Sequence, residues 1–517
     1  MVLGDTSSLS ESASSAIKIN NISHLFAISG LHINLIVEMN KKILNIFIKD
    51  DKKKDNIISV ILILYLMITN FAVSIMRAVS MYLLKIISDR LDLKLSSLDI
   101  ASFVFIIMII YNPFYIYHLG FILSFFACFV IIIFTQSINK LDIKLNSFLE
   151  IILITLILQI STLPVIINVN NSFNLLSFIT NGVFITLVSF IILPFTFLSL
   201  LLPFLSSIYS YVIHAFNFLN EFFSNNFSIN IMVPSFLKGE IIIYYLFILG
   251  FIIVFKDLVK KKKVLYICAF ILFLFIHEEK INFNINGHIY FLDVYEGDAT
   301  VIDLPFNKGV VMIDTGIESS DVISFLKSIG IRKIDYLIIT HNHSDHNGNV
   351  KEIMKTFEVE NIITSVFDES TFSTRKVKTG DEIKISNYCF YVLSPKERSN
   401  NENNNSIVLY SKLGNYRYLF LGDIEKEIEE DLSQYDLDVD CVKVAHHGSK
   451  TSTTKILYNK INPKIVFIET GRVEKLGFPN KDVISFLSKY QIYQTNTDYT
   501  ICASFNPFFS RIKKTKK

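Results

Sequence analysis

Long hydrophobic segments separated by short polar ones fill the first half of the chain. They predict a polytopic all-α membrane bundle of about ten spans, at residues 23–45, 56–71, 73–88, 98–112, 115–136, 147–168, 173–188, 190–207, 241–256 and 264–276. Several spans are shorter than the ~20 residues that a straight transmembrane helix needs, so we interpret these as tilted or broken helices within a bundle. Residues 208–225 are predicted to lie along the membrane surface. Residues 1–22 form a polar N-terminal segment without the apolar stretch of a cleavable signal peptide.

The hydrophobic pattern changes at about residue 281. The segments INFNINGHIYFLDV and KGVVMIDTG have the alternation and the short apolar runs of β-strands, and DVISFLKSIG has helical spacing that ends at a glycine. Strands and helices then interleave to the end of the chain. The pattern therefore predicts a transmembrane domain at 23–280 and a layered α/β domain at 281–517.

Composition agrees with this division. Hydrophobic residues make up 51% of the chain, too many for an ordinary soluble enzyme, and they concentrate in the first half. The second half is slightly acidic, with 29 Lys and Arg against 31 Asp and Glu. Its charge therefore gives no general support for a nucleic-acid-binding surface, apart from the basic tail at 511–517.

Basic residues alternate between the two sets of loops that ten spans define. One set contains the Lys- and Arg-bearing segments 41–54, 90–94, 140–144 and 256–263, and the other set is nearly free of these residues. The positive-inside rule places the basic set in the cytoplasm. The chain is then predicted to be a multi-pass protein of the cytoplasmic membrane with an extracellular C-terminal domain.

Polar side chains within the predicted spans are candidates for lining a channel. A charged group in hydrocarbon is costly, so Arg77 is expected to face the bundle interior or a water-filled path. A structural ion pair, or a side chain that reaches the membrane interface, is the alternative interpretation of Arg77. The channel candidates are His24, Ser29, His32, Arg77 and Asn181.

The densest cluster of chemically active residues is the segment His341–His346, with the pattern HxHxDH, which follows an apolar strand at 336–339. Three of the 11 histidines of the chain lie within these six positions, which disfavours an ordinary polar turn. Imidazole and carboxylate groups together suit zinc, manganese or iron. Two pairs of ligands side by side suit a two-metal site that activates water.

Other polar residues also follow apolar strands in the second half. Asp314 ends a strand in MIDTG and could orient a ligating histidine. Asp423 ends a strand in YLFLGD, where a carboxylate could bridge two metals, and His446 and His447 end a strand in VKVAHHGSKTST. Strands that end at one edge of a sheet would bring these groups together.

The order of these motifs resembles the metallo-β-lactamase-like hydrolases, which carry an Asp after a strand, HxHxDH, a later GD turn and a final His. FLDVxxGDA followed by HHGSKTST resembles one branch, the outer domain of the ComEC family of competence proteins. HLFAISGLH, SIMRAVSM, HLGFILSFFA and the segment around Asn181 resemble the competence domain of the same family. The resemblance covers nearly the whole chain and implies an αββα sandwich after the membrane bundle.

The resemblance also implies roles for individual residues. Two divalent metal ions, Zn or Mn, would be held by His341 and His343 on one side, Asp345 and His346 on the other, a bridging Asp423, and one of His446 and His447. Catalytic roles would fall to Asp345, His346 and the supporting Asp314. Substrate contacts would come from Asp298, Ser449 and Lys450.

The function that the resemblance implies is the uptake of transforming DNA. The membrane domain would conduct a single strand, and the outer domain, a nuclease, would hydrolyse phosphodiesters of the strand that does not enter. Double-stranded donor DNA, membrane lipid and other competence proteins would be the partners. Two alternatives stay open: a membrane-anchored metallohydrolase of phosphodiesters or esters without transport, and a channel whose outer domain binds DNA without cutting it.

The sequence departs from the family pattern at four places. The family's GQGDA reads Glu296–Ala299 after Tyr295, and its GHP reads Gly477–Pro479, without a histidine that could touch substrate. Many metallo-β-lactamase-like enzymes have a further histidine before the GD strand, and this sequence has Glu402–Asn405 in that region. The resemblance then implies that the first metal has one ligand fewer. A solvated loop is the alternative explanation of these residues. An N-terminal region with extra spans and an OB-like domain, which the family often carries, is absent from this sequence; a truncated gene model and a split system are the two explanations that stay open.

Overall fold

The computed structural model describes residues 10–26, 30–140, 146–253, 258–318, 320–471, 477–506 and 508–514. The chain forms two compact units, Met1–Ile231 with Ile241–Ile252, and Met232–Glu240 with Ile253–Lys517. Helix α13 (Lys260–Glu278), which contains the last predicted span, clusters with the second unit. The predicted domain boundaries at residues 22 and 280 therefore stay predictions.

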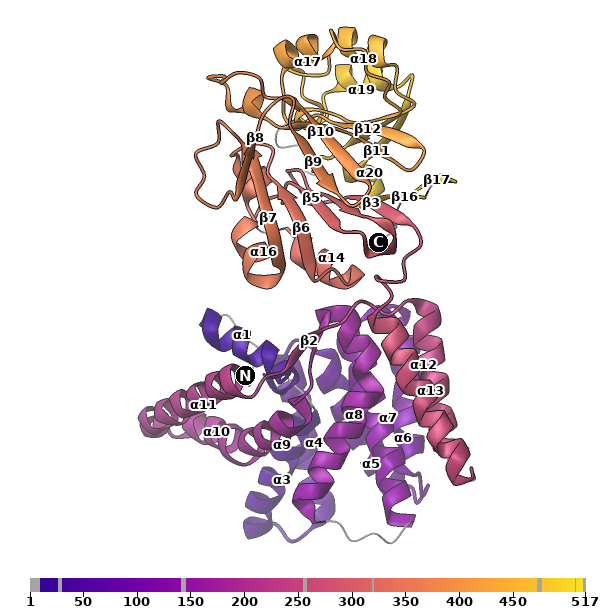
Figure 1. Cartoon of the computed structure of the whole chain (residues 1–517). Coiled ribbons are helices and arrows are strands. Elements are labelled where there is room, and N and C mark those ends of the chain that lie inside the picture. The colour runs from indigo at the N-terminus through magenta and orange to yellow at the C-terminus, as the bar shows by residue number, and fades with distance from the viewer. Residues whose placement is uncertain are drawn as a thin grey trace. The chain divides into compact units, whose positions relative to one another are not determined.

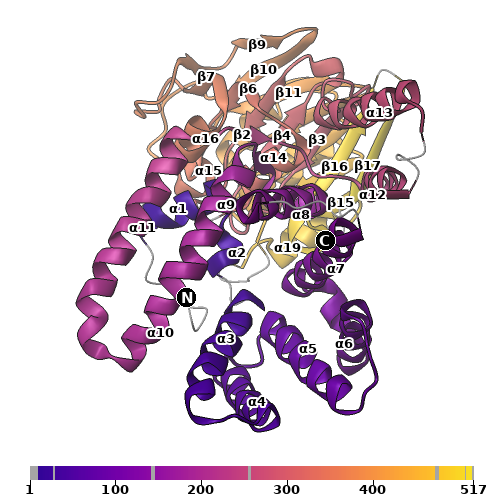
Figure 2. The same cartoon turned by 90° about the horizontal axis from the view of Figure 1, so that it is seen from below.

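The first unit is helical (Figures 1 and 2). Its helices within the described residues are α1 (Glu11–Ile19), α2 (Ser23–Phe26), α3 (Gly30–Phe47), α4 (Asp51–Ile68), α5 (Val73–Arg90), α6 (Ser97–Tyr111), α7 (Leu119–Lys140), α8 (Ser147–Asn170), α9 (Ser177–Leu187), α10 (Leu193–Leu201) and α11 (Ser206–Asn226), with a short strand β1 (Ser172–Asn174). Strand β2 (Asn230–Met232) and helix α12 (Lys238–Ile253) lie where the chain passes between the two units.

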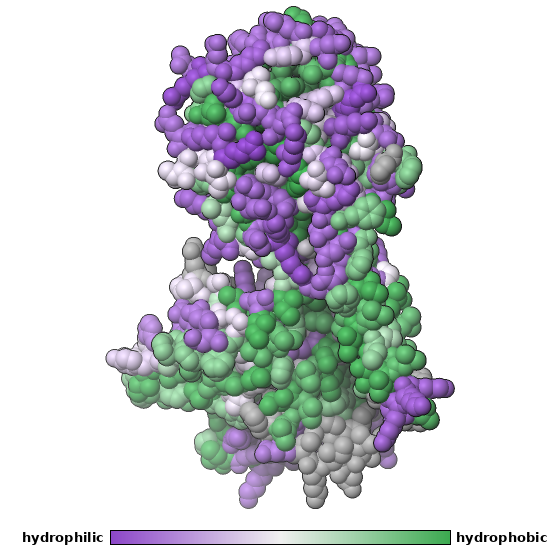
Figure 3. Space-filling view, in the orientation of Figure 1, coloured by the Kyte–Doolittle hydropathy of each residue, from purple (hydrophilic) through white to green (hydrophobic). Residues whose placement is uncertain are grey.

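Three helical stretches in the described part of the chain are long and apolar enough to cross a membrane: Leu119–Gln136, Ile152–Asn170 and Ser177–Ser199. Figure 3 shows that hydrophobic residues cover most of the visible face of this unit. On α6, for example, Phe103 and Ile110 are 50% and 75% exposed. Hydrophobic surface on this scale needs a cover such as lipid, and the chain is a multi-pass membrane protein. The number of spans beyond these three stretches stays a prediction.

The predicted separation of spans 173–188 and 190–207 is wrong. Helices α9 and α10 are joined by one π-helical turn, Val188–Ile192, in which the Leu193 N–H bonds the Val188 carbonyl, five residues back. Pro194 follows directly. Proline lacks an N–H and clashes with the carbonyl four residues earlier, and the wider π turn accommodates both defects without ending the helix.

Residues 208–225, predicted to lie along the membrane surface, belong to α11. This helix packs against α10 and α1, and Figure 2 shows α10 and α11 side by side as a helical hairpin. The Asn20 and Asn220 side chains join the α1 end to α11 through a buried hydrogen bond of 2.7 Å. The position of α11 relative to a membrane surface stays a prediction.

The second unit contains the predicted αββα sandwich (Figure 1). One sheet has the strand order β17-β16-β3-β4-β5-β6-β7-β8 and the other β15-β14-β13-β12-β11-β10-β9. The bounds of its strands are β3 (Gly287–Phe291), β4 (Thr300–Asp303), β5 (Val310–Ile313), β6 (Lys333–Ile338), β7 (Glu358–Ser365), β8 (Arg375–Val377), β9 (Glu382–Ile385), β10 (Tyr388–Ser394), β11 (Val408–Leu413), β12 (Tyr416–Phe420), β13 (Cys441–Lys443), β14 (Ile465–Ile468), β15 (Gln491–Gln494), β16 (Ile501–Phe505) and β17 (Ser510–Lys514).

Three hydrophobic layers hold this sandwich together. The central layer joins the two sheets, and the rings of Phe291 and Phe467 stack across it with their centroids 4.1 Å apart. A second layer lies between the first sheet and the helices α14 (Val322–Ile329) and α16 (Val350–Thr356). The third lies between the other sheet and α17 (Lys426–Leu432), α18 (Lys455–Ile461) and α19 (Lys481–Leu487). The short helices α15 (Ser344–Asn347) and α20 (Thr495–Asp498) lie in loops.

Parallel strand pairing brings the predicted site segments to one edge. Strands β5 and β6 are parallel, as are β12, β13 and β14. The carboxyl ends of parallel strands meet at the same edge of a sheet, so Asp314, the HxHxDH loop, Asp423 and the double histidine all follow strands that end together.

Candidate metal centre

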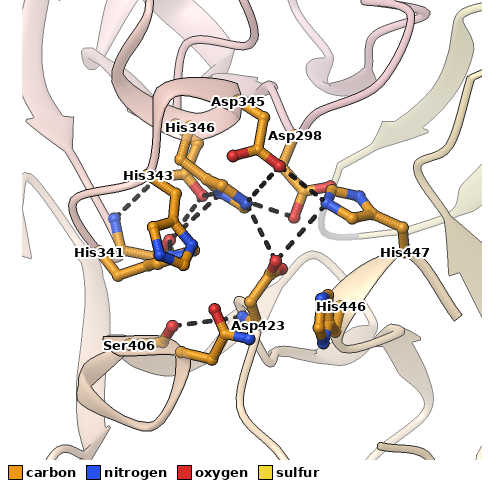
Figure 4. Close-up of polar contacts among 12 residues, drawn as sticks. Asp298, His341, His343, Asp345, His346, Ser406, Asp423, His446 and His447 are labelled. Atoms are coloured by element: carbon orange, nitrogen blue, oxygen red, sulfur yellow. Dashed lines mark hydrogen bonds and ion pairs between the residues drawn. The ribbon is translucent and has the colours of Figure 1, made fainter. Parts of the chain in front are cut away.

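Four ligand-type side chains converge at the carboxyl edge of the sandwich (Figure 4). The ligand atoms of Asp345, His346, Asp423 and His447 all lie within 4.8 Å of one another. His346 Nε2 is 3.2 Å from Asp423 Oδ2. His447 Nε2 is 3.4 Å from Asp345 Oδ2 and 3.5 Å from Asp423 Oδ2. We call these four residues the acid–histidine cluster.

Asp314 lies behind the cluster. Its Oδ2 is 2.8 Å from His346 Nδ1, and its oxygens accept hydrogen bonds from the Thr340 N–H at 2.7 Å and the Thr340 hydroxyl at 2.8 Å. With Nδ1 donating to a carboxylate, His346 presents the lone pair of Nε2 to the cluster. Asp314 thereby determines both the orientation and the tautomer of His346.

His447 is held by the Glu469 carbonyl and lies beside Asp298. The Nδ1 of His447 is 3.1 Å from Asp298 Oδ1 and 3.1 Å from the Glu469 carbonyl oxygen. The other oxygen of Asp298 pairs with Lys443, and both of these side chains are buried. Asp298, predicted to touch substrate, therefore lies behind a histidine, where solvent does not reach it.

The other residues of the HHGSK segment lie outside the cluster. His446, the alternative to His447, has its Nδ1 3.4 Å from the Thr451 hydroxyl. Ser449 is 5% exposed and its hydroxyl accepts a hydrogen bond from the Thr451 N–H. Lys450 is 74% exposed. Of the three predicted substrate contacts, the structure leaves Lys450 open to solvent and buries Ser449 and Asp298.

His341 and His343 form a pair beside the cluster. His341 Nε2 is 2.9 Å from His343 Nδ1, and the rings of His341 and His346 lie 4.2 Å apart between centroids. His341 is buried and His343 is exposed. The two are next to Asp423 in the site (Figure 4), but the four-residue cluster within the described residues does not include them.

The asparagines that replace the family's further histidine are not in a solvated loop, so that interpretation is wrong. Residues Glu402–Asn405 form a short 3₁₀ helix in which Asn403, Asn404 and Asn405 are 8%, 7% and 3% exposed. The Asn404 side-chain oxygen accepts from the Glu425 N–H, and that of Asn405 accepts from the Ser399 N–H, both at 2.8 Å. One backbone donor therefore binds each of these oxygens.

Electrostatics hold the cluster carboxylates negative. Burial alone would raise the pKa of Asp345, but His447 and His346 lower that pKa to about 2. Burial also opposes ionisation of Asp423, yet His346 and His447 hold its pKa well below the usual range. Burial opposes charge on His346 as well, but Asp423 and Asp314 hold its pKa well above the ordinary histidine value. The two carboxylates are thus negative and His346 carries a balancing proton, which a metal ion held by Nε2 would replace.

Two unpaired buried atoms show that the cluster fits a cation. Asp423 Oδ1 and His447 Nε2 have no hydrogen-bond partner within the described part of the chain. Buried polar atoms are nearly always paired, and the His447 ring points into the cluster (Figure 4). Two carboxylates and two imidazoles form a donor set that suits zinc or manganese. The residues present therefore fit a divalent metal ion.

A pocket of about 110 Å³ opens beside the cluster. Its lining residues are Glu296, Asp345, His446, His447, Thr470, Gly471 and Phe478. Asp345 is the one cluster member with substantial exposure, at 34% of its side chain, against 6% or less for the other three. Solvent therefore reaches the cluster from the side of Asp345.

Sequence reasoning did not nominate Lys443 and Glu469. Burial lowers the pKa of Lys443 to about 8 against the attraction of Glu469, and burial raises the pKa of Glu469 to about 7 against the attraction of Lys443. Glu469 also bonds the Thr300 hydroxyl at 3.1 Å. Two features of the sequence could have identified them: a lysine lies inside the apolar run CVKVA, and a glutamate directly follows the apolar run IVFI.

In the helical unit, the structure describes three of the five channel candidates. His32 on α3 and Asn181 on α9 are buried. The Arg77 guanidinium on α5 lies 5.7 Å from the Phe125 ring centroid, and its Nε has no hydrogen-bond partner among the described residues. Within the same residues no carboxylate pairs with Arg77, so the ion-pair interpretation finds no support there. Ser29 and the side chain of His24 lie outside the described residues.

Comparison with known proteins identifies both halves. Residues 1–258 match the family model for competence proteins, and residues 292–386 match the metallo-β-lactamase superfamily. The chain belongs to the competence protein family. In this competence protein the two domains follow one another in the order that the sequence resemblance implied.

Two relatives of this competence protein show the extent of the similarity. ComE operon protein 3 of Bacillus subtilis is 24% identical over 544 residues, which cover 96% of this chain and 69% of that protein. Competence protein ComA of Neisseria gonorrhoeae is 24% identical over 202 residues, which cover 38% of this chain and 29% of that protein. The metallo-β-lactamase fold protein YhfI of Bacillus subtilis aligns over 40% of this chain and 96% of its own, at 10% identity and a TM-score of 0.31. Because that score is low, the fold assignment depends on the strand order and the family model.

Proposed function

We propose that this competence protein takes up transforming DNA across the cytoplasmic membrane. In this proposal the helical unit conducts a single strand, and the hydrolase domain cuts phosphodiesters of the strand that stays outside. The observation that carries the hydrolytic part is the buried acid–histidine cluster with its unpaired Asp423 and His447 atoms. Membership of the competence family and the apolar helices support the transport part.

Each residue of the site then has a defined task. Asp345, His346, His447 and Asp423 would hold one divalent metal ion, and His341 and His343 would hold a second together with Asp423. Bound zinc or manganese supplies Lewis acidity toward a phosphodiester and lowers the pKa of a coordinated water. Asp314 keeps the proton on Nδ1 of His346, and the Glu469 carbonyl does the same for His447, so that both histidines present Nε2 to the site.

The channel part of the proposal is supported by polar groups on otherwise apolar helices. DNA carries a negative charge at every phosphate, so a conduit needs positive or polar groups at membrane depth. Arg77 is a cation without a carboxylate partner in the described residues, and the aromatic face of Phe125 lies beside it. A guanidinium in this setting can form charge-assisted hydrogen bonds to a phosphate.

The experiment that tests the hydrolytic part uses the full-length protein in detergent. We expect the wild type to contain divalent metal by elemental analysis and to hydrolyse DNA. Asp345→Ala should lose activity by more than the roughly 10- to 100-fold that removal of an outer-shell partner costs, and should also lose metal. Asp482→Ala, which removes an 81% exposed carboxylate, is the matched control. A wild type without metal, or an Asp345→Ala variant with full activity, would contradict the proposal.

A further inference from the structure

Phe478 is an aromatic wall of the pocket that the hydrolytic chemistry does not use. Its ring centroid lies 5.5 Å from that of His446 and 6.0 Å from that of His447. The side chain is partly exposed and lines the pocket beside Asp345. It offers neither a metal ligand nor a proton. A partly exposed aromatic ring beside a charged site is suited to covering an apolar face of whatever binds there.

The same pocket carries a carboxylate. Glu296 lines it together with Thr470 and Phe478. A carboxylate repels the phosphate of a nucleic acid but accepts hydrogen bonds from the exocyclic amino groups of bases. An aromatic wall with a carboxylate therefore favours a nucleobase over a phosphate group.

The loop that carries Glu296 is fastened to the metal-type site. A Cβ on Gly297 would lie 2.4 Å from the Asp345 carbonyl oxygen, and the Asp298 N–H donates to that oxygen at 3.2 Å. Tyr295, just before it, is held at φ 64, a conformation that non-glycine residues adopt rarely and that often marks functional sites. A Cβ on Gly471 would lie 3.0 Å from the Tyr295 carbonyl atoms. The loop that carries Glu296 therefore packs against Gly471, another residue of the pocket wall. The Glu296 wall of the pocket is thus packed directly against the backbone of Asp345.

We propose that this pocket is a base-stacking subsite, in which Phe478 stacks on the nucleobase next to the phosphodiester that is cut. The inference rests on the proposed function and specifies its substrate. In a duplex both faces of a base are covered by its neighbours, so only an unpaired base can stack on a side chain. The hydrolase domain therefore acts on single-stranded or locally unpaired DNA, with little preference for sequence, because every base has an aromatic face.

The kinetic test compares Phe478→Ala, Phe478→Tyr and the control Phe306→Ala in full-length protein. Phe306 is 56% exposed and does not line the pocket. Stacking on one aromatic side chain changes affinity by about tenfold or more. We expect Phe478→Ala to raise KM for a single-stranded oligonucleotide by that factor with kcat within about twofold. Phe478→Tyr should retain the wild-type KM, and so should Phe306→Ala.

An oligonucleotide with abasic positions separates stacking from a general loss of structure. Without a base to stack, the wild type and Phe478→Ala should have the same KM. The subsite would be wrong if Phe478→Ala weakened abasic and normal strands equally. It would also be wrong if the wild type preferred blunt duplex to single strands.

A binding test keeps the subsite separate from the hydrolytic function. Asp345→Ala, with and without Phe478→Ala, is titrated with single strands that carry the fluorescent base 2-aminopurine, whose emission falls on stacking. Fluorescence loss that depends on Phe478 supports the subsite even if the wild type cuts no DNA, in which case only the hydrolytic proposal fails. Hydrolysis with equal quenching in both variants would overturn the subsite and leave the hydrolytic function standing.

Discussion

At the scale of single residues, buried charges behind the cluster depend on one another. Lys443 pairs with Asp298 and attracts Glu469, and Asp298 in turn contacts His447. Removing one partner of a buried ion pair leaves an uncompensated charge, which costs about 3–5 kcal/mol. The position of His447 therefore depends on a lysine that has no direct part in the chemistry.

Arg77 is the residue at which the transport proposal can be tested. Arg77→Ala removes the guanidinium from a path that phosphates would follow. Loss of one interaction with a phosphate of ~1.4 kcal/mol corresponds to a factor of about ten, so we expect uptake of transforming DNA to fall by on the order of tenfold. DNA hydrolysis by the same protein should be unchanged. The measurement is transformation frequency beside a nuclease assay, at equal protein levels.

Arg90→Ala is the matched control for Arg77, because Arg90 lies on the same helix and is exposed, with a hydrogen bond to Asn56 at 2.8 Å. Asp345→Ala should show the opposite dependence, with hydrolysis lost and single-stranded donor DNA still admitted. Equal loss of both activities in Arg77→Ala and Asp345→Ala would show that transport and hydrolysis are not separable steps.

At the scale of secondary-structure elements, the loops after parallel strands carry the chemistry and neighbouring helices hold them. Helix α17 does this through Glu429, which is buried and accepts a hydrogen bond from the Thr453 N–H at 2.9 Å and another from the Thr454 N–H. Thr454 is the N-cap of α18. The segment after the double histidine is thereby connected to two helices.

Glu429 gives this unit a predictable pH dependence. Burial raises the pKa of Glu429 from 4.5 to about 7, although the Thr454 and Thr453 amides favour the charged form. Between these two pH values the unfolded chain releases the Glu429 proton and the folded chain keeps it. The free energy that protonated Glu429 contributes to folding is therefore fully present below pH 4.5 and is lost as the pH rises through 7. The total is about 3 kcal/mol.

The test of Glu429 is denaturant unfolding of the full-length protein in detergent, followed by circular dichroism across this pH range. The free energy of unfolding of the wild type should fall with pH relative to Glu429→Gln, which has no proton to release. Glu430→Gln, one residue later and exposed, should follow the wild type. Parallel curves for the wild type and Glu429→Gln would show that Glu429 does not titrate in this window.

At the scale of the whole molecule, the alternation of basic loops predicts the orientation. We expect a reporter that is active only in the cytoplasm to be silent when fused after Lys517 and active when fused near Lys262, because the loop before α13 is basic. A reporter active only outside the cytoplasm should give the reverse pattern. Signal from the cytoplasmic reporter at Lys517 would contradict both the topology and the uptake proposal.

Much of this architecture follows from hydrophobic periodicity, which acts locally. Long apolar runs before residue 281 indicate membrane helices, and strand-length runs after it indicate an α/β domain. Both patterns can be recognised from the sequence because they involve residues that are neighbours in the chain. The HxHxDH segment could be identified for the same reason, since its four candidate ligands lie within one loop. The exception is the helix from α9 to α10, which was predicted as two separate spans and which a π turn before Pro194 keeps continuous.

Only the tertiary structure decides the contacts between segments that are distant in sequence. The alternation of side chains along a strand cannot distinguish His446 from His447, because both residues follow the end of β13. Their φ values are positive, at 48° and 51°, so successive side chains no longer point to opposite faces of the sheet there. The pairing of Lys443 with Asp298 joins residues 145 positions apart, and no local pattern records it. The hydrophobic pattern determines which segments form strands and helices; the packing of two sheets determines which of their polar ends meet, because that depends on strand order and register across the whole domain.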